Sequence, residues 1–292
     1  MPVLERGAFL LSIDTELGDA AISSRSAHVV TCLLELMVKY HVRATWAVMG
    51  SSLDPGPRDV LSSQYRQVMR EIMEQNGTQE LGCHTFSHVR AGDPACSRAR
   101  FEAELEACRA VAQQSGISFR SFIYPYNSIG HLGSLGKFGL TAYRGRAPVW
   151  YEGLPTPVRR ICNLLDHWFF IPPPTVQASY QHGVWNLPAS YFYVCGSGWG
   201  RMIPVWLRIN KAREGLRRAA EKKRLFHMWF HPFNLVNDTG MWLKGLESIF
   251  AEVERYRDLG RLDNPTMGEL ASRLQGTIQA KTGGVPVHGP SR

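Results

Sequence analysis

Two histidines, His84 and His88, stand four residues apart in this sequence of 292 residues. At that spacing two imidazoles share one face of a helical turn and suit a common metal ion. Asp14 and Glu16 supply carboxylates directly after an apolar run. Because these two acids are two residues apart, their side chains point to the same face of an extended chain. The residues therefore predict a site of two histidines and one acid, with positions open for water and substrate.

Each of these residues also has an ordinary structural explanation. Histidine pairs can cap loops or lie satisfied in a core, and acids after a strand commonly cap the helix that follows. A single late histidine, His231, could be a hydrogen-bonded residue at a strand end. The prediction depends on the conjunction, because Asp14, His84, Asn127 and His231 all stand at the ends of predicted strands.

Apolar periodicity predicts the elements that would position these side chains. Short apolar runs indicate strands, and apolar residues three and four apart indicate helices. The predicted strands are residues 8–13, 44–49, 79–83, 119–124 and 224–230. The predicted helices are residues 28–40, 60–75, 97–115, 201–223 and 241–259, with a short one from residue 266.

The order of these elements predicts an α/β fold. Strands and helices alternate with short connections through the first half of the chain, which is typical of βαβ units around a parallel sheet or barrel. In such folds functional groups collect where strands end. Prolines and aromatics between about residues 149 and 200 predict long loops. We therefore expect one catalytic domain over residues 1–280 and a disordered tail over residues 281–292.

Composition narrows the classes of protein and partner. Hydrophobic residues make up 44% and charged residues 20%, which is typical of a soluble globular protein and not of a disordered or fibrous chain. The net charge of +8 is concentrated in residues 201–224 and in the tail. It favours a solvated helix face, or anionic partners such as phosphorylated or lipid-linked sugars or a membrane surface. No nucleic-acid-binding motif accompanies it, so we expect no nucleic-acid partner.

The cysteines and the amino-terminal residues indicate the cellular compartment. The six cysteines contain no C-x-x-C pair, and the apolar run at residues 8–13 is too short for a signal core or a membrane span. We therefore expect a cytoplasmic protein with reduced thiols and no transmembrane segment.

The sequence resembles the polysaccharide deacetylases, carbohydrate esterase family 4, from Phe9 to about Leu274. The segments that carry the resemblance are LSIDTELGD (11–19), RATWAVMG (43–50), ELGCHTFSH (80–88), RSFIYPYNSIGH (120–131), AYRG (142–145) and FHMWFHPFNL (226–235). The resemblance implies a distorted (β/α) barrel of about seven mainly parallel strands. It also implies bound zinc or another divalent transition metal, and hydrolysis of an N-acetyl amide on an amino sugar.

Residue by residue, the resemblance implies that His84 and His88 bind the metal and that Asp14 is the general base. In the family a second carboxylate, which ligates the metal, follows the first at once, but Thr15 occupies that place here. Glu16, one position later, is the candidate ligand, and the roles of the two acids could be exchanged. His231 matches the histidine that serves as general acid toward the departing amine.

The resemblance also assigns residues around the substrate. Tyr126 lies in the family's proline-aromatic motif, so its amide N–H would help to hold the oxyanion. Asn127 would contact a substrate hydroxyl or acyl oxygen, and turn chemistry after a proline is its alternative. The family's Asp-Trp segment is missing, and Arg144 is the nearest substitute, as a residue that binds substrate or orients Asp14. We expect His227 to lie deeper in the barrel in a structural role.

Zinc in such a site would lower the pKa of water toward about 7 and polarise the amide carbonyl. Asp14 would accept the proton of the attacking water, and His231 would give a proton to the sugar nitrogen. Aromatic rings suit the faces of sugars, although most of those in the middle region are expected to fill loop interiors. The candidates are Trp150, Tyr151, Trp168, Trp185, Tyr191, Tyr193 and Trp199.

We therefore expect a metal-dependent N-deacetylase whose substrate is a carbohydrate or lipid-linked sugar, from a nucleotide-linked, lipid-linked or polysaccharide precursor. Peripheral membrane contact is compatible with this prediction. One alternative is a deformylase or cyclic-amide hydrolase on the same scaffold. Another, which Thr15 supports, is a non-catalytic binding protein that retains the fold.

Overall fold

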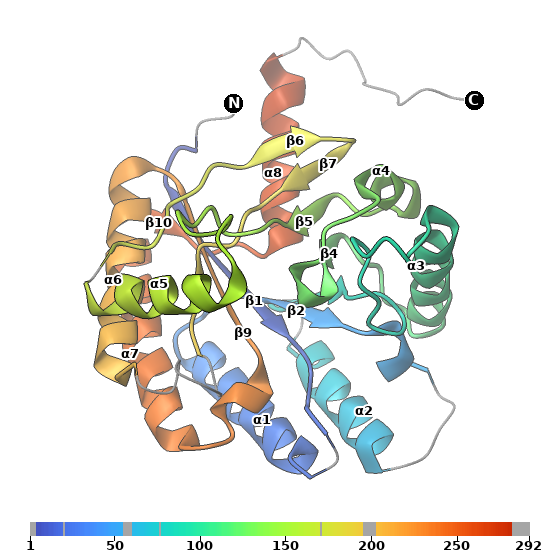
Figure 1. Ribbon diagram of the computed structural model, residues 1–292, viewed down its shortest axis with the longest axis horizontal. Helices are drawn as coiled ribbons and strands as arrows, with labels where there is room; N and C mark the ends of the chain where they lie inside the picture. The colour runs from blue at the N-terminus through green and yellow to red at the C-terminus, as the bar shows by residue number, and fades with distance from the viewer. Residues whose placement is uncertain are drawn as a thin grey trace.

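The computed structural model describes residues 4–19, 21–54, 60–75, 77–169, 171–194 and 203–281 (Figure 1). Its strands are β1 (Gly7–Asp14), β2 (Thr45–Val48), β3 (Glu80–Cys83), β4 (Ser121–Ile123), β5 (Ala142–Arg144), β6 (Ser179–Gln181), β7 (Val184–Asn186), β8 (Tyr191–Phe192), β9 (Leu225–Phe230) and β10 (Leu262–Asp263). Its helices are α1 (Ser23–Lys39), α2 (Val60–Met73), α3 (Arg98–Gln114), α4 (Leu132–Leu135), α5 (Thr156–Trp168), α6 (Val205–Lys222), α7 (Thr239–Asp258) and α8 (Met267–Lys281).

The described strands form one sheet of ten, in the order β6-β7-β5-β4-β3-β2-β1-β9-β8, with β10 paired to β1. Every pairing of named strands is parallel except that of β6 with β7. The sheet curls into a half-barrel, and its end strands β6 and β8 are not paired with each other in the described chain (Figure 1). The predicted α/β fold with mainly parallel strands is confirmed.

Strand β1 runs through the centre of this sheet and is buried along its whole length. Alternate side chains of a strand point to opposite faces. Phe9 and Leu11 accordingly pack in the apolar cluster shared with α1, α6 and α7. Ala8 and Leu10 pack in a second cluster, with residues of α8. Burial on both faces explains why the segment reads as a continuous apolar run.

The expectation of long loops between residues 149 and 200 is wrong in part. This region contributes α5, the hairpin of β6 and β7, and β8 at one end of the sheet. These strands are only two or three residues long, too short to show an alternating pattern. The predicted tail lies outside the described residues, apart from the end of α8.

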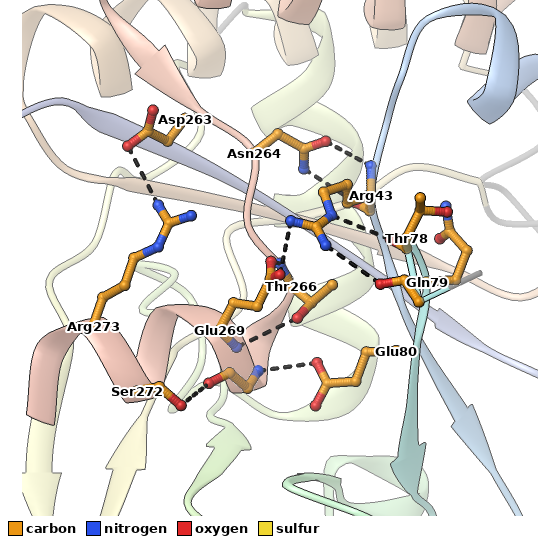
Figure 2. Close-up of polar contacts among 12 residues, drawn as sticks. Arg43, Thr78, Gln79, Glu80, Asp263, Asn264, Thr266, Glu269, Ser272 and Arg273 are labelled. Atoms are coloured by element: carbon orange, nitrogen blue, oxygen red, sulfur yellow. Dashed lines mark hydrogen bonds and ion pairs between the residues drawn. The ribbon is translucent and has the colours of Figure 1, made fainter. Parts of the chain in front are cut away.

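The amino ends of the strands are closed by a polar network (Figure 2). The Asn264 side chain accepts from the backbone N–H of Arg43 at 2.7 Å and donates to the carbonyls of Phe9 and Arg43. The Arg43 guanidinium pairs with Glu269 of α8 at 2.7 Å. The network thus fastens the start of α8 to β1 and β2.

Two further expectations concern thiols and membranes. Five cysteines of the described chain are free, and Cys195 lies outside it. None of the helices that the structure describes is both long enough and apolar enough to cross a membrane.

Candidate metal and catalytic site

The carboxyl ends of the parallel strands bring together the residues that the sequence singled out. Asp14 is the last residue of β1 and Arg144 the last of β5, while His84 and His231 come directly after β3 and β9. Because β1 pairs with both β2 and β9, and β2 pairs with β3, these strand ends lie along one edge of the sheet. The predicted clustering at strand ends is what the fold produces.

Glu16 lies at the centre of the cluster. Its Oε1 atom is 3.0 Å from Nε2 of His88 and 3.6 Å from Nε2 of His84. The ligand atoms of these three residues lie within 4.8 Å of one another. Thr15, which occupies the family's ligand position, is buried, and its backbone N–H donates to the Ala47 carbonyl. One residue further along the chain, Glu16 reaches the histidines.

The tautomer of His84 indicates that a cation could lie between its Nε2 atom and the Glu16 carboxylate. Its Nδ1 is 2.7 Å from the carbonyl oxygen of Ile123, so Nδ1 carries the proton. Its Nε2 is buried and has no hydrogen-bond partner among the described residues. A neutral His84 would therefore direct a lone pair toward the carboxylate of Glu16. A cation between the two acceptors would satisfy both, and two imidazoles with one carboxylate are a set that divalent zinc and similar metals accept.

Asp14 lies next to this set, within 4.8 Å of the ligand atoms of Glu16 and His231, and its carboxylate is bound by Arg144. The guanidinium donates to both carboxylate oxygens, at 2.6 and 2.8 Å, and both side chains are buried. Burial alone would raise the pKa of Asp14. The charge and hydrogen bonds of Arg144 outweigh it and hold the pKa below its ordinary value, so Asp14 is a carboxylate at neutral pH. A bidentate pair of this kind also fixes the direction in which the carboxylate points.

His231 lies close to both acids. Its Nε2 is 3.7 Å from Oδ2 of Asp14 and 3.6 Å from Oε1 of Glu16. Burial lowers the pKa of His231, and the two carboxylates oppose that effect. The rings of Phe192, Trp229 and Phe233 surround the imidazole, with centroids 4.9 to 5.8 Å from its own.

Left-handed backbone conformations gather around the site. Thr85, His88, Tyr126 and Asn127 have φ angles of 59°, 62°, 56° and 51°. Non-glycine residues adopt such angles at a cost of about 1–3 kcal/mol, and they persist where surrounding structure imposes them. The centroid of the Tyr126 ring lies 4.7 Å from that of His88, and the Arg90 guanidinium lies over the Tyr126 ring at 3.6 Å. The predicted oxyanion residue therefore adjoins a predicted metal ligand.

Arg144 and Asn127 were predicted to contact substrate. In the structure the Arg144 side chain is fully buried and donates to Asp14, and it also donates to the Asn127 side-chain oxygen at 3.2 Å. Its position matches the other expectation for it, that of orienting Asp14.

Ser12 belongs to the same network, although no pattern in the sequence singles it out. Its hydroxyl accepts from Arg144 at 3.0 Å and lies 3.0 Å from Nε2 of His227. Nδ1 of His227 is 3.1 Å from the Leu187 carbonyl, and burial together with Arg144 lowers the pKa of His227 to about 3. A neutral His227 with its proton on Nδ1 can therefore accept from Ser12. His227 lies deep in the barrel, as predicted.

A cavity of about 280 Å³ has none of the candidate ligands in its walls, but it shares two aromatic residues with the surroundings of His231. Phe192 and Trp229 line it and also pack against His231. Tyr151 and Trp150 line it too, and Trp150 is exposed. Of the other predicted sugar-stacking aromatics, Trp168 is exposed, Trp199 lies outside the described residues, and Trp185, Tyr191 and Tyr193 are buried.

Residues 18–137 match the family model described as polysaccharide deacetylase. The match covers the histidine pair and Tyr126 and begins just after Glu16. No curated protein sequence matches the chain.

Three solved structures align with this chain. A "putative polysaccharide deacetylase" from Mycobacterium smegmatis aligns with a TM-score of 0.67 at 14% identity, covering 100% of this chain and 96% of that one. A family 4 carbohydrate esterase from Streptococcus mutans aligns at 0.48 and 14% identity, covering 89% and 87%. A pseudoenzyme of that family from Bacillus anthracis aligns at 0.47 and 14%, covering 91% and 66%. At these identities the likeness is one of fold.

Proposed function

We propose that this chain is a member of the polysaccharide deacetylase family and a metal-dependent hydrolase that removes the N-acetyl group from an amino sugar. The observation that carries the proposal is the convergence of Glu16, His84 and His88 on one point beside a separately held Asp14. A non-catalytic binding protein would have no need to hold a buried carboxylate ionised next to an open ligand set.

We assign Glu16, His84 and His88 as ligands of a divalent transition metal, for which zinc is the leading candidate. When bound, such a metal supplies Lewis-acid polarisation of the amide carbonyl and lowers the pKa of water. The Ile123 carbonyl fixes the His84 tautomer, so that Nε2 presents its lone pair to the ion. The geometry favours Glu16 over Asp14 as the ligand, because both Asp14 oxygens are bonded to Arg144.

Asp14 is the general base in this proposal. Its lowered pKa keeps it ionised at neutral pH, and Arg144 directs its carboxylate toward the ligand cluster. His231 is the general acid that protonates the departing amine. Its Nε2 lies 3.7 Å from Asp14, so the proton is accepted and delivered within one small region. The amide of Tyr126 donates to the developing oxyanion.

The cavity beside His231 bears on the substrate. A pocket of about 280 Å³, lined by aromatic rings and by the charged residues Asp166, Arg208 and Lys211, exceeds what an acetyl group alone would fill. We propose a lipid-linked or nucleotide-linked amino sugar as substrate, acted on in the cytoplasm, with the aromatic walls in contact with the sugar or its carrier.

A substrate panel with metal analysis tests the proposal. The purified protein is expected to hold one divalent ion per chain and to release acetate from an N-acetyl amino sugar. N-formyl sugars and cyclic amides complete the panel. Hydrolysis of cyclic amides alone would remove the sugar from the proposal, and a protein that binds no divalent ion and hydrolyses none of these amides would refute it.

A further inference from the structure

Helix α5 presents an apolar face to solvent. Val158, Ile161, Leu165 and Trp168 are 44%, 45%, 42% and 49% exposed, and Phe169 after the helix is 74% exposed. Their spacing of three and four residues places them on one side of the helix. We call these five residues the apolar face of α5. In a helix of a globular domain this stripe normally faces the core.

An adjacent side of α5 is attached to the rest of the protein through polar contacts. Asp166 is buried and forms an ion pair with Lys211 of α6, which also donates to the Asp166 carbonyl at 3.1 Å. Cys162 is buried on the same side. Figure 1 shows α5 beside α6, with which it packs. The helix is therefore fixed by an ion pair, and its apolar side chains remain uncovered by the described chain.

The charges of α5 indicate what covers this face. Arg159 and Arg160 are exposed, and neither forms an ion pair with a carboxylate of the described residues. The one acidic residue of the helix, Asp166, is occupied by Lys211. An exposed apolar stripe flanked by cations is the pattern of a helix that lies in the plane of a lipid–water interface.

We propose that α5 binds the surface of an anionic lipid bilayer, with its apolar face inserted and its arginines at the headgroups. The net charge of +8 supports such attraction over the whole protein. Large exposed apolar patches on soluble proteins mark interaction sites, and the two arginines favour a lipid surface over an uncharged protein partner.

Membrane binding by α5 would place the cavity at the lipid surface. Asp166 of α5 lines that cavity, as does Trp150, which is 61% exposed just before the helix. The far wall, Phe192 and Trp229, packs against His231. A substrate carried on a lipid would then approach the site without leaving the bilayer. This last step rests on the proposed function, whereas membrane binding itself does not.

Co-sedimentation with vesicles tests the proposal. The full chain is mixed with vesicles of phosphatidylcholine alone, or of phosphatidylcholine and phosphatidylglycerol at about 7:3. We expect binding to the anionic vesicles that weakens at high salt. The double substitution Ile161→Asp and Leu165→Asp should reduce the partition coefficient about tenfold or more, because it removes apolar area from the face.

The matched control is Leu259→Asp, an apolar residue 57% exposed at the end of α7. It should bind vesicles as the unchanged protein does, and equal melting temperatures of all variants would show that folding is intact. Equal vesicle binding by the double variant, or no vesicle binding by the unchanged protein, overturns the proposal. A dimer that dissociates in the double variant without any vesicle binding overturns it in favour of a second copy. Deacetylation of a water-soluble substrate is measured separately, so loss of hydrolysis cannot be confused with loss of membrane binding.

Discussion

A glutamate lies among polar side chains at the amino ends of the strands, and another lies among polar side chains at their carboxyl ends. The partners of the two glutamates differ. At the amino ends, Glu80 accepts from the hydroxyls of Thr45 and Ser121 at 2.8 and 2.7 Å and from the Gly268 N–H at 2.9 Å. At the carboxyl ends, Glu16 faces imidazole nitrogens.

The difference lies in the partners. Hydroxyls and backbone amides donate hydrogen bonds at any physiological pH. The hydrogen bonds that Glu80 accepts therefore all come from groups of the protein itself. Imidazole nitrogens facing Glu16 can be acceptors, and Nε2 of His84 has no partner among the described residues. Buried polar atoms are normally paired, and an unpaired one indicates a ligand or a catalytic role. A cluster whose polar atoms are all hydrogen-bonded holds helices and strands together. A cluster with an unpaired polar atom can bind an ion.

The largest expected effect is that of His84→Ala. Loss of a buried ligand should abolish stoichiometric metal binding and reduce kcat/KM about 10³-fold or more, because the several kcal/mol of metal catalysis are lost. Metal content by mass spectrometry and acetate release measure the two effects. His28→Ala, on an exposed surface of α1, is the matched control. A His84→Ala variant with unchanged metal content and unchanged kcat/KM would show that the carboxyl ends of the strands hold no metal site at His84.

Asp14→Asn separates the base from the ligands. The amide retains the shape of the carboxylate but cannot accept a proton, so kcat should fall about 10² to 10³-fold while the bound metal remains. Glu16→Gln should instead lower metal affinity. Kinetics and metal analysis of both variants distinguish the roles. Loss of metal in Asp14→Asn with retention in Glu16→Gln would exchange the assignments of the two acids.

The sequence was sufficient for the elements and residues whose signal is local. Both ends of strands β1 and β9 were predicted to within one residue, because long buried strands appear in the sequence as apolar runs. Asp14, His84 and His231 were found because polar residues at the ends of such runs stand out.

Other features depend on contacts that no local pattern shows. Strands β6, β7 and β8 are held by pairing with neighbours rather than by their own two or three residues. Ser12 reads as part of an apolar run, and only the fold brings it to Arg144 and His227, 132 and 215 residues away. The exchange of roles between Asp14 and Glu16 stayed open for the same reason, since the bidentate Arg144 comes from a distant strand.

At the amino ends of the strands, Glu80→Ala is expected to act on stability and leave chemistry unchanged. The substitution leaves two hydroxyls and one backbone N–H without an acceptor, at about 1 kcal/mol each, so the free energy of unfolding should fall by about 3 kcal/mol. Chemical denaturation measures this loss, and kcat per folded molecule measures the chemistry. A reduced kcat at full folding would mean that the two ends are coupled through the strands.

The smallest expected effect concerns the start of α8. Thr266 accepts from the Glu269 N–H at 3.4 Å, and the Glu269 carboxylate accepts from the Thr266 N–H at 3.0 Å, which is a capping box. Thr266→Ala should lower the free energy of unfolding by about 1 kcal/mol, and Thr266→Ser should restore it. The change should be detectable by denaturation and absent from metal binding, because the cap and the histidine cluster share no partner among the described residues. An altered metal affinity in Thr266→Ala would contradict the independence of the amino and carboxyl ends of the strands. It would mean that a small destabilisation of α8 changes the positions of Glu16 and His84.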